Sequence, residues 1–370
     1  MPAKAPVPAV DARPRASFAD GTRFETLDGH DSHVSHTSPR RLLRRRRSQG
    51  RGPKHYLAKG SVSIVPNGGY VASCMLAVAN AYLSLRGQSD TFTAHFEYVQ
   101  KTAPGPAIVV VDEVKLGRQI STLHVTLWQG GQVLDHAPWF VASSSRRKVL
   151  AYTNHVELAA FTGLSIPTGY EETAAAMMPA VPDFNLLKTV GTDGVWAKGL
   201  LPNNPIRKGS PEHWYMLIPR HGPLTPGVCD IWISATAGQA LTQAALPYVV
   251  DAFPFELLAL LAASRYFDPV EPGEIVQRRK SRYGLWLPTV LLNLEVKKRL
   301  PSQGVEWLNL SITAKQIKNG RMDLAITVRD LAGELVALGS QVSLIVSMER
   351  NTGNGTGSGK GLSPHEKAAL

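Results

Sequence analysis

Residues 66–99 read PNGGYVASCMLAVANAYLSLRGQSDTFTAHFEYV and decide the fold of the chain. The opening Pro-Asn-Gly-Gly is a turn signal, and apolar residues such as Val71 and Leu83 then recur at helical spacing with small residues between them. We therefore expect a helix over 70–86 that a sheet can wrap closely. The stretch ends in alternating apolar and polar residues over 93–99, which predicts a strand.

Alternating segments continue along the rest of the chain. In the first half they predict strands over 107–116, 121–129 and 132–142, separated by turns rich in glycine and proline. A second strongly apolar segment, over 246–263, predicts another helix. The strands expected in the second half are 212–219, 229–235, 290–298, 306–315, 321–329 and 335–346.

The two halves repeat one another in order and, in places, in residues. Ala94–Tyr98 (AHFEY) aligns with Leu292–Val296 (LNLEV), and Gly117-Arg118 aligns with Gly320-Arg321. Each half is thus a helix followed by an antiparallel meander, which indicates an internal duplication. We therefore predict an α+β fold, a double hotdog, in which two tandem helix-wrapped antiparallel sheets pack side by side.

Composition divides the chain into five segments. Residues 1–60 are basic and rich in Pro, Ser and His, and we expect them to be disordered. Residues 61–149 should form the first hotdog and 209–350 the second, with a Pro/Gly/Thr/Asn-rich linker over 150–208 between them. The Gly/Ser-rich residues 351–370 should form a second disordered tail.

Most of the positive charge lies in the first 60 residues. Thirteen Lys/Arg and five Asp/Glu there supply +8 of the net charge of +11, which leaves +3 for the other 310 residues. We therefore do not expect the folded body to bind nucleic acid. The run Arg44–Arg47 is compatible with a nuclear or organellar address, with a solvated tail, or with sequence wrongly joined upstream of the true first strand.

Other features of the composition concern compartment and partners. No apolar run of about eighteen residues occurs, so no membrane span and no membrane partner are expected. Cys74 and Cys229 are the only cysteines, which suits a reducing compartment. We expect a cytoplasmic protein that could form a homo-oligomer.

Over 61–351 the order of motifs resembles the fungal thioesterase-like superfamily and, more distantly, bacterial acyl-CoA thioesterase II. The motifs that carry the resemblance are PNGGY at 66–70, HFEY at 95–98, PGPA at 104–107, KLGR at 115–118, LPYVVD at 246–251, PTVLLNLEVKK at 288–298, GVEW at 304–307 and AKQIKNGR at 314–321. The resemblance implies two hotdogs side by side with acyl-thioester chemistry at their junction. It also implies acyl-CoA or an acyl-carrier thioester as partner.

The resemblance further implies a water held by an Asp, a Thr and a Gln of the second hotdog. Our alignment puts the Gln on Gln341, the Thr on Lys315 and the Asp within 291–293, where Asn293 is the only polar residue. An amide can hold a water but cannot accept its proton. Asp251 is the best replacement carboxylate, and its alternative role is to cap a helix or bond the sheet.

The start of the first helix supplies candidate substrate-binding residues, namely Gly68, Gly69 and Tyr70. Free amides and the positive end of the helix dipole favour negative charge there, so the two glycines could hold a thioester oxyanion. A tight turn that merely lets the sheet approach is the alternative.

Three further polar residues are candidates by position. His95 stands in the first repeat where Asn293 stands in the second, and it is either a base or a structural histidine. Arg118 and Arg321 follow the matched glycines, and they either contact phosphates of a CoA-like carrier or are solvated turn residues.

Three functions are compatible with these residues. The leading hypothesis is an acyl-CoA or acyl-carrier thioesterase that releases a carboxylic acid, with secondary metabolism as a plausible setting. The second is a non-hydrolytic hotdog that binds an acyl or polyketide intermediate, and the third is a dehydratase-like hotdog with His95 as base. No phosphate loop, Gly-x-Ser-x-Gly elbow or zinc-ligand spacing of His occurs, so we expect no cofactor and no metal.

Overall fold

One large antiparallel sheet dominates the computed structural model, which describes residues 24–26, 54–58, 66–131, 139, 141, 143–173, 176–199, 214–236, 239–252 and 285–347. Its strand order is β1 (Phe24–Thr26), β2 (Lys54–Ala58), β4 (Ala107–Leu116), β5 (Ser121–Gln129), β6 (Arg146–Val156), β3 (Asp90–Tyr98), β11 (Thr289–Val296), β15 (Leu335–Leu344), β14 (Arg321–Arg329), β12 (Leu308–Thr313), β9 (Val228–Ala235), β8 (Trp214–Pro219) and β7 (Trp196–Lys198). Beside this path, β13 (Ile317–Lys318) pairs with β14, and β10 (Leu285–Trp286) pairs separately with β16 (Val346–Ser347).

Helix α2 (Gly68–Ser84) covers the sheet of the first half. It begins at the turn glycines, two residues before the predicted range of 70–86, because Asn67 is an N-cap whose side-chain oxygen accepts the Tyr70 N–H at 3.1 Å. Its buried residues include several small ones, and it packs on β3, β4 and β5. Small side chains let the sheet curve closely around the helix, which produces one apolar core.

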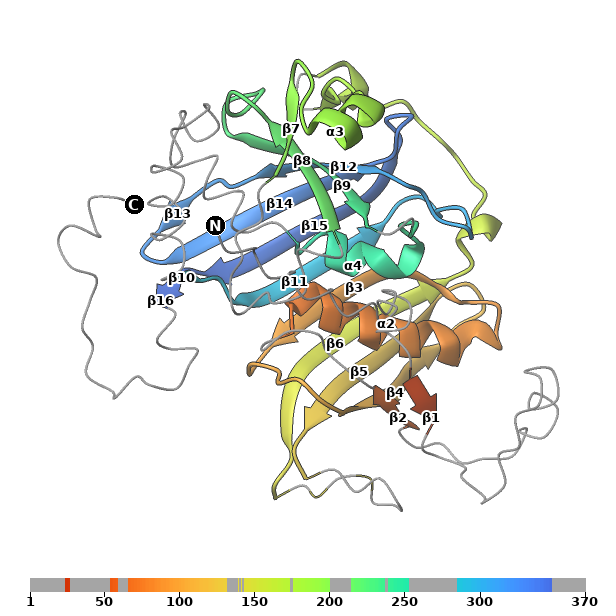
Figure 1. Ribbon diagram of the computed structural model, residues 1–370. Coiled ribbons are helices and arrows are strands. Elements are labelled where there is room, and N and C mark those ends of the chain that lie inside the picture. The colour runs from red at the N-terminus through yellow and green to blue at the C-terminus, as the bar shows by residue number, and fades with distance from the viewer. Residues whose placement is uncertain are drawn as a thin grey trace, which may run out of the picture.

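The second half repeats this arrangement around α4 (Leu246–Val249), which begins at the residue where the predicted second helix begins. Leu246, Val249 and Val250 are fully buried in the same core. Asp251 and Ala252 follow directly, and the remainder of the predicted helix, from 253 to 263, lies outside the described residues. Figure 1 shows α2 (orange) and α4 (teal) next to one another on one side of the sheet.

The two halves join edge to edge through β3 and β11. These strands pair antiparallel, with His95 opposite Asn293 and Phe96 opposite Leu292. The two residues matched by the repeat alignment, His95 and Asn293, therefore meet directly across the junction. Two helix-covered antiparallel meanders joined side by side are the double hotdog that the duplication predicts.

Part of the segment between the halves, helix α3 (Phe184–Val190), packs on the outer face of the second sheet. The segment also contains the short 3-10 helices η2 (Leu158–Ala160) and η3 (Tyr170–Glu172), and a further 3-10 turn, η7 (Gln243–Ala245), precedes α4. Phe184 stacks on Trp307 with ring centroids 4.4 Å apart and meets Trp232 edge-on. This aromatic cluster is separate from the main core.

The first hotdog extends beyond both of its predicted boundaries, residues 61 and 149. β6 runs to Val156 and lies between β5 and β3, so the first hotdog extends past residue 149 into the predicted linker. The predicted strand at 132–142 lies almost wholly outside the described residues.

Two strands form within residues 1–60, where we expected no structure. β1 pairs with β2, and β2 pairs with β4. Segments of three and five residues are too short for periodicity to reveal.

The rest of the two predicted disordered tails lies outside the described residues. Among the described residues, the helices are too short or too polar to span a bilayer.

Candidate active site

A cluster of polar side chains lies where the two halves meet. Asp251 follows α4, Thr289 is the first residue of β11 and Gln341 lies in β15. Asp251 and Gln341 are each 1% exposed, so both are in effect out of bulk water. Register accounts for the approach of the strand residues, because Gln341 is opposite Leu292 in the β11–β15 pair and points to the helix-covered face.

Hydrogen bonds link the three side chains into a closed group. Gln341 Nε2 donates to Asp251 Oδ1 at 2.6 Å and lies 2.8 Å from Thr289 Oγ1. The Thr289 hydroxyl donates to the same Asp251 Oδ1 at 2.8 Å. One oxygen of the carboxylate thus receives two hydrogen bonds, which hold the side chain in one orientation. Gln341 Oε1 is buried and has no hydrogen-bond partner among the described residues.

The first half supplies the donor to the other carboxylate oxygen. Gly69 N–H, in the first turn of α2, donates to Asp251 Oδ2 at 2.6 Å, and Asn67 Nδ2 lies 3.4 Å from the backbone oxygen of Asp251. The approach requires glycine, because a Cβ on Gly69 would lie 2.4 Å from Pro247 O and 2.7 Å from Asp251 Cβ. The positive end of the helix dipole therefore faces a buried carboxylate.

Tyr98 of β3 completes the group. Its hydroxyl donates to Gly68 O at 2.7 Å, and a Cβ on Gly68 would lie 3.2 Å from the Tyr98 ring. Burial, and to a smaller extent the negative charge of Asp251, raises the pKa of Tyr98 well above its ordinary value. The phenol is therefore protonated, and a hydrogen-bond donor, across the neutral range.

The positions to which the alignment assigned the Thr and the Asp, Lys315 and residues 291–293, lie outside this group, which nevertheless contains an Asp and a Thr. Lys315 and Asn293 do not join the group; Asp251 and Thr289 do. The backbone N–H of Lys315 bonds Asp323, at 3.3 Å. Thr289 is the only threonine between Asp251 and Leu300. If the Asp implied by the resemblance is placed on Asp251, Thr289 is therefore the first threonine that follows it in the sequence.

The structure places His95 and Asn293 on the opposite face of the sheet from Gln341. Successive strand residues point to opposite faces, and Phe96, opposite Leu292, shares the helix-covered face. His95 Nδ1 lies 2.7 Å from Asn293 Oδ1, and Asn293 Nδ2 donates to Ser340 Oγ at 2.9 Å. Asn293 is therefore not part of the group that contains Asp251 and Gln341, and His95 is not placed to act as a base beside them.

The two candidate arginines also lie away from Asp251. Arg118 is exposed, and its backbone oxygen accepts a hydrogen bond from Gln88, which lies beyond the C-terminal end of α2. The seventeen residues of α2 place that end about 25 Å from Gly68. Arg321 is exposed at the start of β14 and alternates with the buried Met322, so its side chain points to the outer face.

The phenol of Tyr70 is hydrogen-bonded to the Cys74 thiol, within α2. Burial raises the pKa of both groups, that of Cys74 to about 12. Tyr70 and Cys74 line a small cavity of about 30 Å³ with Thr102 and Gln129.

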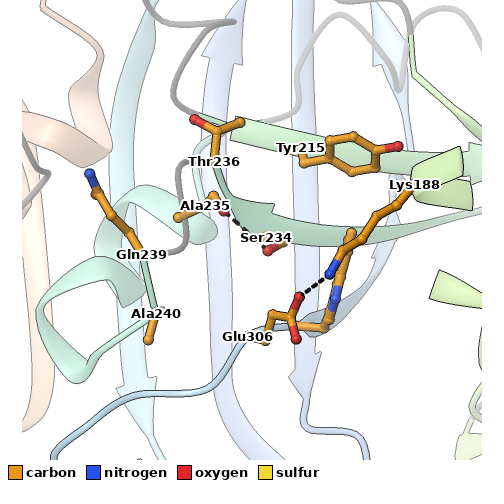
Figure 2. Close-up of a pocket in the computed structure, with 9 residues that line it drawn as sticks. Lys188, Tyr215, Ser234, Ala235, Thr236, Gln239, Ala240 and Glu306 are labelled. Carbon is orange, nitrogen blue, oxygen red and sulfur yellow. Dashed lines mark hydrogen bonds and ion pairs between the residues drawn. The ribbon is translucent and has the colours of Figure 1, made fainter. Parts of the chain in front are cut away.

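A larger cavity, of about 450 Å³, is separate from the Asp251 group. Figure 2 shows it between α3, β8, β9 and the turn at 239–240, with the Lys188–Glu306 ion pair at 2.6 Å in its wall. The full lining set is Lys188, Tyr215, Ser234, Ala235, Thr236, Gln239, Ala240, Glu306 and Trp307. Within the described part of the chain, no three His, Cys, Asp or Glu side chains gather as they would around a metal ion.

Comparisons with known proteins assign the chain to a family. Profiles for the N-terminal and C-terminal domains of acyl-CoA thioesterase match residues 58–146 and 196–345. The chain belongs to the acyl-CoA thioesterase family. It is 46% identical over 357 residues to the thioesterase-like protein TwmA of Talaromyces wortmannii, a match that covers 93% of this chain and 96% of the relative.

Solved structures agree with the fold. A hot dog fold protein of unknown function from Alicyclobacillus acidocaldarius matches with a TM-score of 0.57 and 16% identity, covering 89% of this chain and 97% of its own. A thioesterase II candidate from Thermobifida fusca matches with a TM-score of 0.55 and 16% identity, covering 90% and 99%.

The acyl-CoA thioesterase profiles also divide the polar group between the two domains. Asp251, Thr289 and Gln341 lie within the C-terminal thioesterase domain, whereas Gly69 and Tyr98 lie within the N-terminal one. The group is therefore complete only when both domains are present.

Proposed function

We propose that the chain hydrolyses acyl thioesters, of CoA or of an acyl carrier, at the Asp251 group. The observation that carries the proposal is the buried, hydrogen-bonded set of Asp251, Thr289 and Gln341, with the amide end of α2 on the same carboxylate. An Asp, a Thr and a Gln are the three types that the resemblance to bacterial thioesterase II implies for holding the attacking water.

Asp251 acts as the general base in this proposal. Its carboxylate takes one proton of a water while the water oxygen attacks the thioester carbonyl carbon and the carbonyl oxygen becomes an oxyanion. The intermediate then collapses: the carbonyl re-forms, the carbon–sulfur bond breaks, and the departing thiolate takes the proton back from Asp251. The products are a carboxylic acid and a free thiol, and the carboxylate is regenerated.

Thr289 and Gln341 orient the base and the water. The two donors on Asp251 Oδ1 hold the carboxylate in one rotamer, so its lone pairs have a fixed direction. Gln341 Oε1, the acceptor that the described residues leave without a partner, accepts the second hydrogen of the water.

The N-terminus of α2 stabilises negative charge throughout the reaction. In the resting state its Gly69 N–H bonds the carboxylate. When Asp251 takes the proton, the negative charge moves to the oxyanion, and the same helix end favours it there. The sequence-based prediction of an oxyanion site at Gly68 and Gly69 therefore stays a proposal, with Gly69 as the donor.

The positions of Asp251, Thr289 and His95 favour hydrolysis over the two competing functions, non-hydrolytic binding and a dehydratase-like reaction. A non-hydrolytic binding protein would not need a carboxylate and a threonine to hold a water, whereas Asp251 and Thr289 are bonded to one another here. A dehydratase-like reaction required His95 as base, and His95 lies on the opposite face of the sheet.

A thiol-release assay with a panel of acyl-CoA esters tests the proposal. Asp251→Asn should lower turnover by about two to four powers of ten, the usual contribution of one general base. It should also lower the free energy of unfolding by about 1 to 3 kcal/mol, because an amide nitrogen would face a buried N–H or hydroxyl donor.

Asp230→Asn is the matched control. Asp230 is also a buried aspartate, 4% exposed and bonded to Ser311 Oγ at 2.7 Å, but it lies on β9, three strands from β15. It should lose comparable stability and keep its turnover when both variants are assayed fully folded. Equal turnover in the two variants, or no hydrolysis of any acyl thioester by the wild type, would reject the proposed function.

A further inference from the structure

The peptide group that joins Gly68 to Gly69 is bonded at both ends by side chains from different halves of the chain. Its carbonyl oxygen, Gly68 O, accepts the Tyr98 hydroxyl at 2.7 Å, and its N–H, Gly69 N, donates to Asp251 Oδ2 at 2.6 Å. We propose that Tyr98 is a positioning residue for the thioesterase reaction, one that aims and polarises this peptide group toward Asp251. The proposal rests on the function proposed above.

The chemistry of the peptide unit couples the two bonds. The unit is planar, so fixing the direction of its carbonyl also fixes the direction of its N–H. A donor on the carbonyl oxygen draws electron density away from the nitrogen and makes the N–H a stronger donor, as in other chains of hydrogen bonds at low dielectric. The Tyr98 hydroxyl therefore strengthens the hold of Gly69 on Asp251.

The position of this peptide in the helix makes an anchor necessary. Gly68 and Gly69 are the first two residues of α2, where a helix frays most readily. Neither residue has a side chain to hinder rotation of the plane, and Gly69 must be glycine to let α4 approach. Rigidity that a side chain would otherwise provide has to come from a neighbouring element.

Tyr98 is itself held in place. It ends β3 on the same face as Phe96, and the two rings stack with centroids 6.5 Å apart. The closeness of its ring to the Gly68 backbone leaves the hydroxyl little freedom to turn away. Its raised pKa keeps the hydroxyl proton on the phenol at every pH at which an esterase assay is run.

Tyr98→Phe tests the proposal, because it removes one oxygen and leaves the ring packing. Turnover (kcat) should fall about tenfold with KM unchanged, the factor expected when one hydrogen bond to a charge-bearing network is lost. Independently of activity, hydrogen–deuterium exchange in the peptide that spans Gly68 to Val71 should become faster, because the Gly69 amide loses its fixed direction.

Tyr82→Phe is the matched control on the same helix. Tyr82 lies near the C-terminal end of α2, and its hydroxyl bonds Glu113 on β4. This variant should keep both kcat and the exchange rate at Gly68 to Val71.

The outcomes separate this inference from the proposed function. Wild-type kcat and wild-type exchange in Tyr98→Phe, or a loss of thermal stability with kcat unchanged, would overturn the positioning role while leaving thioesterase activity standing. If the wild type hydrolyses no thioester, the proposed function fails, and unchanged exchange in Tyr98→Phe would then also remove the structural basis of the inference.

Discussion

Gly69→Ala is the most direct perturbation of the contact between the two halves. The added Cβ would lie 2.4 Å from Pro247 O, 2.7 Å from Asp251 Cβ and 2.8 Å from Tyr248 Cα, whereas ordinary contacts begin near 3.4 Å. Two of these three atoms belong to the backbone, so no change of rotamer relieves the clash. The start of α2 and the end of α4 must separate by about 1 Å.

That displacement has two measurable consequences. The Gly69 N to Asp251 Oδ2 distance, 2.6 Å, would grow to about 3.6 Å, which is beyond hydrogen-bonding range. We expect the free energy of unfolding to fall by about 1 to 3 kcal/mol, the usual cost of overpacking. Turnover should fall by about two powers of ten, because a shift of about 1 Å in a catalytic group has an effect of that size.

Urea unfolding followed by circular dichroism, together with initial rates of thiol release on fully folded protein, measures both effects. Gly163→Ala is the control, because its Cβ would meet no atom within 4 Å and should change neither quantity. A Gly69→Ala protein with wild-type stability and wild-type rates would show that α2 and Asp251 are not in contact, and the proposed site would have to be abandoned.

Two further predictions concern the histidines. His95→Ala should leave turnover within about twofold of wild type, because His95 lies on the sheet face opposite Gln341; a loss of tenfold or more in steady-state rates would restore it as a candidate base. Burial of His155 lowers its pKa to about 4, below the unfolded value of about 6.5, so the stability that it contributes is complete above pH 6.5 and is lost as pH falls toward 4. Unfolding free energies at pH 7 and pH 5 should differ by about 2 kcal/mol more in wild type than in His155→Gln, and equal pH dependence in the two proteins would contradict the assignment.

The sequence predicts the architecture well where local signals are strong. The strands at 107–116, 121–129 and 321–329 have the predicted bounds, and α2 begins at the turn glycines, because alternation, capping and glycine conformation are properties of neighbouring residues. β6 was missed, because what identifies it as a core strand is its place between β5 and β3. No property of residues 146–156 alone reveals that placement.

Within the candidate site, the sequence by itself singled out two of the side chains. Asp251 was chosen as the replacement carboxylate and Gln341 was matched by resemblance, and the structure brings the two together. Both inferences rest on residue identity and motif order, and both of these can be read directly from the sequence.

Only the tertiary structure decided which groups complete the site. Thr289 is separated from Asp251 by 38 positions and Gly69 by 182, so their contacts depend on strand register and on how α2 meets α4. A shift of register by one residue would have turned Gln341 to the outer face and brought Asn293 and His95 toward the helices. The sequence therefore determines which groups are available, whereas the pairing of β11 with β3 and with β15 determines which of them share a face.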